Sequence, residues 1–204
     1  MNSLKTKLAI SFSLMVIIAV LIETFDLIYI QRPYNYAIEE KSDKKDILRI
    51  KNAFQSMANE LSVLTYDNAV WDQTYQYIDM TNPDFTKNNF IKDAYKSLSI
   101  NGVHLYDKNS AIVWGKVYTK DYQKIIPFPA FSKPNKFVKN NLLITQELVD
   151  KNKGKPLSLS GYIYLEKELI LFAATSIFHS SAQGKPNGTL IYWRYVDEKV
   201  ITYL

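Results

Sequence analysis

The hydrophobic pattern of the chain begins with one long apolar run. From Leu8 to Ile30 most positions are apolar, two lysines precede the run and one arginine closely follows it. A run of about 23 residues can cross a bilayer of roughly 30 Å, provided that Glu23 and Asp26 lie near the outer interface. The run lacks a small-residue cleavage site, which favours a retained anchor over a signal peptide. We therefore expect a membrane anchor over residues 1–31, with a cytoplasmic N-terminus and residues 32–204 outside the cytoplasm.

A second pattern predicts an amphipathic helix after this anchor. Apolar residues three and four positions apart alternate without error along this stripe, which consists of Ile47, Ile50, Phe54, Met57, Leu61 and Leu64. Fewer than three heptads is short for an independent coiled coil, so packing on a sheet of the same domain is favoured over dimerisation. We expect Arg32 and Pro33 to end the membrane span, and the later helix to continue, with a possible break, into Tyr66–Tyr77.

The rest of the chain alternates turn signals with short apolar runs. A second helix is expected over Phe85–Leu98, and residues Tyr122–Asn141 should be irregular because three prolines interrupt them. The other expected elements are a β-hairpin (Val103–Tyr106 and Ala111–Tyr118), a short helix within Leu142–Val149, three strands (Leu157–Leu165, Leu169–Phe178 and Thr189–Val196) and a closing helix, Asp197–Leu204. This order predicts an α+β domain whose mainly antiparallel sheet of about five strands carries the long N-terminal helix on one face.

The composition of the chain argues against several kinds of functional site. The 204 residues include no cysteine and two histidines, so thiolate metal sites, a cysteine nucleophile and a histidine-rich metal centre are excluded. His104, in a strand run, and His179, at a strand end, are expected to be packing or surface residues. The sequence contains no phosphate loop, dinucleotide fingerprint or nucleophile elbow, so we expect no enzyme activity, cofactor or metal. A net charge of +5, spread over lysines, and an extracytoplasmic location argue against a nucleic-acid partner.

The densest cluster of acidic and aromatic side chains lies in Tyr66–Tyr77. Read as a helix, this stretch places Asp67, Trp71, Thr74 and Tyr75 on one face, beside a row formed by Asn68 and Asp72. The two aspartates diverge at a spacing of five residues, so they do not form a tight acid/base pair. Core packing explains the aromatic residues and is the favoured role for Trp71, with ligand contact as the alternative.

Several segments together form a recognisable set. Its residues are Tyr66-Asp67-x-Ala69-Val70-Trp71-Asp72-x-Thr74-Tyr75, Asn88, Asn89, Asn101, Asp107, Ser160-Gly161, Ala173–Ile177, Gly184-x-Pro186-x-Gly188-Thr189-Leu190-Ile191, Arg194 and Val196-Asp197 onward. This set resembles the fourth type of CHASE domain, the extracytoplasmic sensory module of bacterial membrane receptors. The resemblance implies a PAS/Cache-like sheet with a long N-terminal helix, followed in most members by a second span and a cytoplasmic output. That output is often cyclic-di-GMP turnover or a histidine kinase. Neither a second span nor an output motif occurs in this sequence, which implies a fragment of a longer receptor or signalling through a partner.

Two functional hypotheses follow. The first is a ligand-sensing input domain in the bacterial cytoplasmic membrane, a homodimer through its N-terminal helix, that binds an unidentified small molecule between the sheet and its loops. The candidate binding residues are Asp67, Trp71, Asp72, Tyr75, Asn101, Trp114 and Arg194. Arg194 could instead form a buried ion pair with Asp67 or Asp72. The second hypothesis is a membrane-anchored interaction domain without a ligand, which an exposed apolar stripe on the helix would favour.

Overall fold

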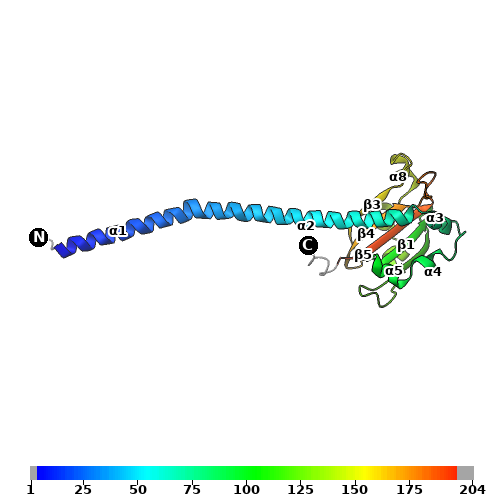
Figure 1. Ribbon diagram of the computed structural model, residues 1–204, viewed down its shortest axis with the longest axis horizontal. Helices are drawn as coiled ribbons and strands as arrows, with labels where there is room; N and C mark the ends of the chain where they lie inside the picture. Colours follow the sequence, from blue (N-terminus) through cyan, green and yellow to red (C-terminus); the bar gives the residue numbers. More distant parts are fainter. Residues whose placement is uncertain (1–3, 197–204) are drawn as a thin grey trace. The chain divides into compact units, whose positions relative to one another are not determined.

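The structure, a computed structural model, describes residues 4–196 (Figure 1). The chain divides into two compact units, Met1–Lys51 and Asn52–Leu204. The expected closing helix, Asp197–Leu204, lies outside the described residues.

The first unit is helical throughout its described part. Helix α1 (Leu4–Asp26) passes through a π-helical turn, η1 (Leu27–Gln31), into α2 (Arg32–Ala69). This continuous helix includes an exposed apolar stretch near its N-terminus that is long enough to cross a membrane. The expected break at Arg32 and Pro33 is wrong. Pro33 cannot donate a backbone hydrogen bond, and the wider π-turn, in which the Arg32 N–H reaches the Leu27 carbonyl, accommodates it within the helix.

The second unit is built on one antiparallel sheet. Its five strands are β1 (Gly102–Asp107), β2 (Ile112–Val117), β3 (Ser158–Leu165), β4 (Glu168–Ser176) and β5 (Gly188–Tyr195), in the order β2-β1-β5-β4-β3. In the centre of the sheet, Gly102 of β1 and Phe172 of β4 both face Trp193 of β5. The predicted hairpin and the three later strands are therefore confirmed, as is the α+β class.

One face of the sheet is covered by the part of α2 that belongs to the second unit. Leu61 is buried there, and Met57 and Leu64 pack around it against sheet residues such as Leu171 and Tyr192. The earlier members of the predicted stripe differ, because Ile47 and Ile50, in the first unit, are 66% and 48% exposed. The stripe is thus divided between packing within the domain and exposure.

The helix expected over Phe85–Leu98 is two short helices, α4 (Phe85–Asn89) and α5 (Lys92–Ser97). The interruption at Phe90 follows from packing, because this residue leaves helical geometry (φ −109°, ψ 51°) and buries its ring against Trp114. Tertiary contact therefore overrides the helical periodicity of this segment.

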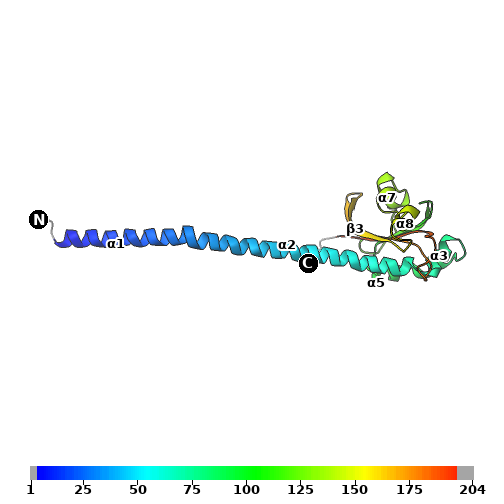
Figure 2. The same ribbon diagram turned by 90° about the horizontal axis from the view of Figure 1, so that it is seen from above.

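Short helices and loops cover the opposite face of the sheet, as Figure 2 shows for α7 and α8. They are α6 (Pro129–Ser132), α7 (Lys136–Asn141) and α8 (Gln146–Lys151). The first two correct the expectation of an irregular segment over Tyr122–Asn141, since Pro129 stands at a helix start, where its missing N–H costs nothing. The helix expected within Leu142–Val149 is α8, shifted because the Thr145 hydroxyl accepts a capping hydrogen bond from the Leu148 N–H.

Candidate functional site

The stretch Tyr66–Tyr77 is not one helix. Helix α2 ends at Ala69, Trp71 is extended (φ −144°, ψ 131°), and α3 (Asp72–Ile78) then begins. The break arises because Val70 forms an isolated bridge with Phe178, just after β4, whose N–H donates to the Ala69 carbonyl at 3.2 Å. The expected common face of Asp67, Trp71 and Tyr75 is therefore wrong.

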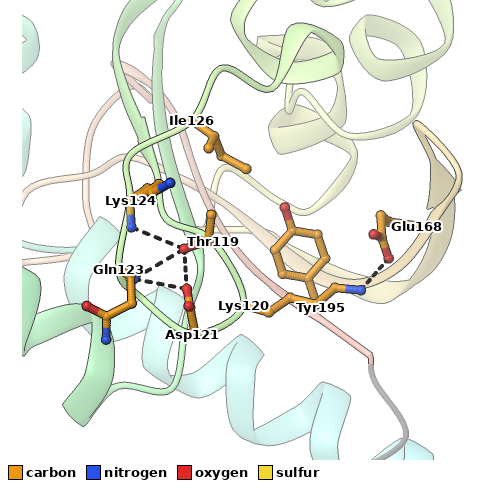
Figure 3. A pocket seen from close by; sticks show the side chains of 8 residues that line it. All are labelled: Thr119, Lys120, Asp121, Gln123, Lys124, Ile126, Glu168 and Tyr195. Atoms are coloured by element: carbon orange, nitrogen blue, oxygen red, sulfur yellow. Dashed lines mark hydrogen bonds and ion pairs between the residues drawn. The ribbon is translucent and has the colours of Figure 1, made fainter.

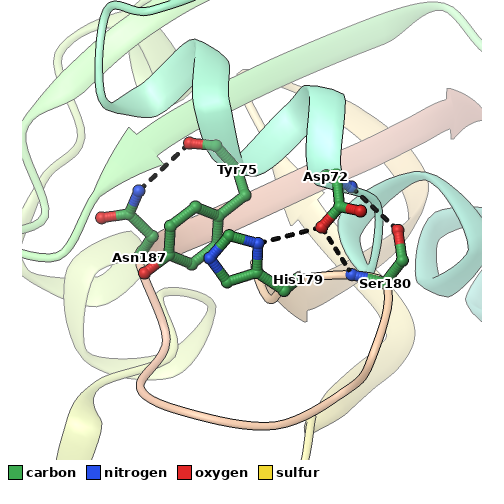
Figure 4. Close-up of polar contacts among 5 residues, drawn as sticks. All are labelled: Asp72, Tyr75, His179, Ser180 and Asn187. Atoms are coloured by element: carbon green, nitrogen blue, oxygen red, sulfur yellow. Dashed lines mark hydrogen bonds and ion pairs between the residues drawn. The ribbon is translucent and has the colours of Figure 1, made fainter.

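The first residue of α3 is held by the segment that follows β4. The Asp72 carboxylate accepts hydrogen bonds from the Ser180 N–H at 3.1 Å and from His179 Nδ1 at 2.9 Å (Figure 4). The Asp72 N–H in turn donates to the Ser180 hydroxyl at 3.0 Å. The backbone N–H of Ser180, followed by the His179 imidazole, lowers the pKa of the Asp72 carboxyl below its usual value.

Two further contacts fix α3 to the same segment. The Tyr75 ring stacks on the His179 imidazole with 3.7 Å between ring centroids. The Asn187 side-chain amide donates to the Tyr75 carbonyl at 3.2 Å and to Asp79 Oδ1 at 2.9 Å. We call Asp72, Tyr75, His179, Ser180 and Asn187 the α3 clamp. It joins α3 to the chain between β4 and β5 by contacts that span more than 100 residues of sequence.

A cavity of about 400 Å³, the α3 cavity, adjoins this clamp. Two clamp residues, Tyr75 and Asn187, belong to its wall. The complete lining is Tyr75, Lys108, Asn109, Ile144, Gln146, Lys185, Pro186, Asn187 and Gly188. Lys108 and Lys185 bring two ammonium groups to this wall, and no lining residue is acidic. Amide, phenol and ammonium groups on one concave surface suit a small anionic ligand.

A larger cavity, of about 530 Å³, lies elsewhere on the domain, between the Thr119–Ile126 segment and Tyr195 (Figure 3). Its charged groups are largely matched within the protein. Lys120 Nζ lies 2.8 Å from a Glu168 carboxylate oxygen and 5.0 Å from the centroid of the Tyr195 ring. None of the predicted site residues lines this cavity. Size alone therefore does not make it the better candidate.

Three of the predicted site residues lie outside the clamp, near or within the core. Trp71 packs edge-on against Phe85 with 5.7 Å between ring centroids, and Trp114 stacks on Phe90 at 5.2 Å. Asn101 is buried, and its side chain accepts from the Tyr195 N–H and donates to the Thr119 carbonyl. This amide therefore completes the hydrogen bonding of β5 where β1 begins.

Asp67 and Arg194 do not meet. Asp67 lies on the exposed side of α2, and Arg194 is half-buried on β5 near Tyr162. Within residues 4–196, Arg194 forms no ion pair with Asp67 or Asp72, so that alternative is wrong. Its guanidinium Nε is buried without a hydrogen-bond partner among the described residues.

The structure thus brings together two predicted residues, Asp72 and Tyr75, with residues that sequence reasoning missed. The sequence favours a packing or surface role for His179, and no helical or strand periodicity connects it to Asp72. The glycine- and proline-containing segment before β5, which holds Lys185 and Asn187, was the available signal, because such segments often carry binding residues. No group of three metal-ligating side chains occurs in the part of the chain that the structure describes.

The comparisons with known proteins agree with this fold. The family model of the CHASE4 domain matches residues 53–204. The sensor domain of the V. cholerae histidine kinase DctB is similar at 8% identity, with a TM-score of 0.52, 84% of this chain covered and 60% of that chain. The extracellular domain of the putative histidine kinase vpHK1S-Z8 is similar at 9% identity, with a TM-score of 0.55 and coverages of 83% and 62%.

This chain therefore spans about three fifths of each of these solved structures, and at such identities their likeness shows the fold. It confirms the predicted PAS/Cache-like sheet with a long N-terminal helix. No curated protein matches the chain. Because the family model covers most of the chain, the chain belongs to the CHASE4 domain family, and its domain is an extracytoplasmic sensory input domain.

Proposed function

We propose that this domain senses a small anionic molecule in the α3 cavity and passes the bound state to α2. The observation that carries the proposal is that Tyr75 and Asn187 belong both to the cavity wall and to the α3 clamp. A ligand at that wall contacts α3 directly, and only Val70 and Trp71 separate α3 from α2. A ligand that favours one position of α3 therefore shifts the equilibrium between two packings of α2 by its difference in affinity.

The proposed receptor is anchored in the bacterial cytoplasmic membrane by α1 as a single span, with its sensory domain outside the cytoplasm. A piston or twist of α2 would carry the signal to an output such as cyclic-di-GMP turnover or a histidine kinase, located in another part of the receptor. The exposed residues Ile47 and Ile50 are the proposed contact between two copies in a homodimer.

A thermal-shift screen of the full chain in lipid nanodiscs tests this function. The probes are inorganic phosphate and a panel of short mono- and dicarboxylates. A ligand at one hundred times its dissociation constant stabilises the folded state by about 2.7 kcal/mol. We expect a stabilising anion whose effect is lost in Lys108→Ala and Lys185→Ala. Lys139→Ala, which removes an exposed lysine of α7 that does not line the cavity, is the matched control and should keep the effect.

The second candidate is a domain that docks without a small ligand, and it rests on the exposure of Ile47 and Ile50. No shift across the anion panel, together with a solution dimer that Ile50→Ser dissociates, would favour this function. A shift that survives both lysine substitutions would contradict the proposed location of the anion site.

A further inference from the structure

The larger of the two cavities described above, of about 530 Å³, lies at the end of the sheet away from the α3 clamp. Its walls are the segment Thr119–Ile126, which follows β2, Glu168 at the start of β4 and Tyr195 at the end of β5. The clamp instead holds the chain between the end of β4 and the start of β5. The two cavities share no lining residue, so this cavity, which we call the β5-end cavity, is separate from the site of the proposed function.

One wall of the β5-end cavity carries an ion pair whose groups are matched but not saturated (Figure 3). Lys120 Nζ lies 2.8 Å from Glu168 Oε2, and the two side chains are 45% and 39% exposed. An ammonium has three N–H donors and a carboxylate accepts several hydrogen bonds, so one contact leaves capacity on both groups. This wall therefore offers a donor and an acceptor to a ligand that leaves the ion pair intact.

The opposite wall, the Thr119–Ile126 segment, also presents one charge of each sign. Asp121 accepts hydrogen bonds from the Thr119 hydroxyl and the Gln123 N–H, and these donors lower the pKa of its carboxyl and keep it ionised. Both bonds reach Oδ1, so Oδ2 is available as an acceptor. Lys124 is exposed, and among the described residues its ammonium forms no hydrogen bond or ion pair.

Between these walls lies the Tyr195 side chain. Its hydroxyl points toward Ile126 and forms no hydrogen bond with another described residue (Figure 3). Burial, together with the nearby carboxylates of Glu168 and Glu166, raises the pKa of Tyr195 to about 12, so the hydroxyl keeps its proton at neutral pH. It can therefore both donate and accept a hydrogen bond, beside the apolar side chain of Ile126.

From this arrangement we propose that the β5-end cavity binds a neutral saccharide of one or two sugar units. A sugar hydroxyl both donates and accepts, so neighbouring hydroxyls can bond to the ammonium and carboxylate groups of both walls and to Tyr195. The cavity volume lies within the usual range for small-ligand sites, about 300–1,000 Å³.

The charges of the lining favour a neutral ligand over a charged one. Two lysines and two acidic residues give the lining no net charge, and a ligand with a net charge would meet a like charge on either wall. A zwitterion would have to compete with the existing pair of Lys120 and Glu168, whereas a hydroxyl bonds to the free positions of that pair.

The test is saturation-transfer difference NMR of the full chain in lipid nanodiscs. The probes are the methyl glycosides of glucose, galactose and mannose, and we expect saturable transfer to at least one of them. Lys124→Met keeps the length of the side chain and removes its charged donors, so it should weaken binding about tenfold, or about 1.4 kcal/mol. Lys133→Met, at an exposed lysine that does not line the cavity, is the matched control and should keep the affinity.

A second variant removes a single hydroxyl. Tyr195→Phe keeps the ring that lies 5.0 Å from Lys120 Nζ, and it should also weaken glycoside binding, whereas Tyr164→Phe, outside the cavity, should not. No transfer to any glycoside, or an affinity that Lys124→Met and Tyr195→Phe both leave unchanged, would overturn the proposal. Glycine betaine is the zwitterionic counter-probe, and its binding in place of every glycoside would overturn it as well. Lys108→Ala, which tests the α3 cavity, should leave glycoside binding intact, so the two proposals fail separately.

Discussion

The two faces of the sheet are covered in different ways. On one face, the second-unit part of α2 packs through Leu61 and its neighbours, and the only side-chain hydrogen bond from the sheet to this part, among the described residues, is that from the Tyr162 hydroxyl to the Phe54 carbonyl at 2.9 Å. On the other face, side chains bond the covering segments to the sheet at several points. Tyr106 donates to the Phe131 carbonyl at 2.6 Å, and Thr189 accepts from the Ile144 N–H at 2.9 Å.

Because of this difference, we expect α2, the movable layer, to shift more easily than the loop-covered segments, the fixed layer. Apolar packing is not directional, so a helix held mainly by burial can slide or rotate at small cost. Hydrogen bonds between buried groups are directional and costly to leave unmade, so they hold the loop-covered layer in one arrangement. This division suits the proposed function, in which α2 moves while the loop-covered layer stays in place.

The largest expected effect tests the fixed layer. Phe131→Ala removes a fully buried ring that stacks on His104 and Trp193, so it should lower the free energy of unfolding by about 3–5 kcal/mol. Denaturant unfolding followed by near-UV circular dichroism measures this loss. Phe137→Ala, at a half-exposed position in the same layer, should change stability by less than about 0.5 kcal/mol. Equal losses in the two variants would mean that the loop layer is not packed as a core.

The second prediction concerns acid stability and compares the buried His104, in the fixed layer, with the exposed His179, in the α3 clamp. His104 has a folded-state pKa of about 3, below the unfolded value, so only the unfolded chain gains a proton as the pH falls below about 6.5. Stability should therefore drop by about 2 kcal/mol between pH 7 and pH 5, because each pH unit is worth about 1.4 kcal/mol. His104→Asn, which keeps an acceptor for Trp193 but does not titrate, should lose this drop. His179→Asn, at an exposed histidine, should retain it.

The same contrast explains which parts of the fold were predictable from sequence. The stripe through Leu61 and the alternation in the strands follow directly from which positions face the core, so α2, the hairpin and the three later strands were predicted. The loop-covered layer has no such repeat. Its helices are too short for periodicity, and the break at Phe90 depends on Trp114, a partner from another element.

The candidate site was only partly predictable for a related reason. Asp72 and Tyr75 could be predicted because both belong to the local stretch Tyr66–Tyr77, which is dense in acidic and aromatic residues. Their partners His179 and Asn187 lie more than 100 positions away, and a single sequence contains no distance information at that range. The buried environment of His104 likewise depends on Gly115 and Trp193, and only the strand register brings these residues together.

A smaller effect tests the movable layer. Tyr162→Phe removes the sheet hydroxyl that donates to the Phe54 carbonyl of α2 and keeps the ring that packs edge-on against Phe54 at 4.9 Å. We expect the free energy of unfolding to fall by about 0.5–1.5 kcal/mol. Relative to the wild type, hydrogen exchange should speed up more in α2 near Phe54 than in the sheet. Tyr164→Phe, at an exposed position of the same strand, serves as the control. Unchanged exchange in α2 would mean that this hydrogen bond does not restrain the helix.

The smallest expected effect is at the α3 clamp, where the movable helix ends. Asp72→Asn keeps the shape of the side chain but removes the charge that the Ser180 N–H and His179 bind. Because these donors lower the pKa of Asp72, its contribution is complete above the usual aspartate value, about 3.9, and is lost as the pH falls through the lowered value. The variant should therefore exchange the amides of α3 faster than the wild type at neutral pH, and the difference should disappear as the pH falls through the lowered pKa of Asp72.

Asp67→Asn, on the exposed side of α2, makes the same chemical change outside the clamp and should leave α3 exchange unaltered at both pH values. If Asp72→Asn and Asp67→Asn behave alike at neutral pH, the carboxylate does not hold α3. The clamp would then not hold α3 in one position, and a ligand that contacts Tyr75 would have no fixed arrangement of α3 to change. If only Asp72→Asn loosens α3, the end of the movable helix is held by a charged contact that a neighbouring anionic ligand can strengthen or weaken.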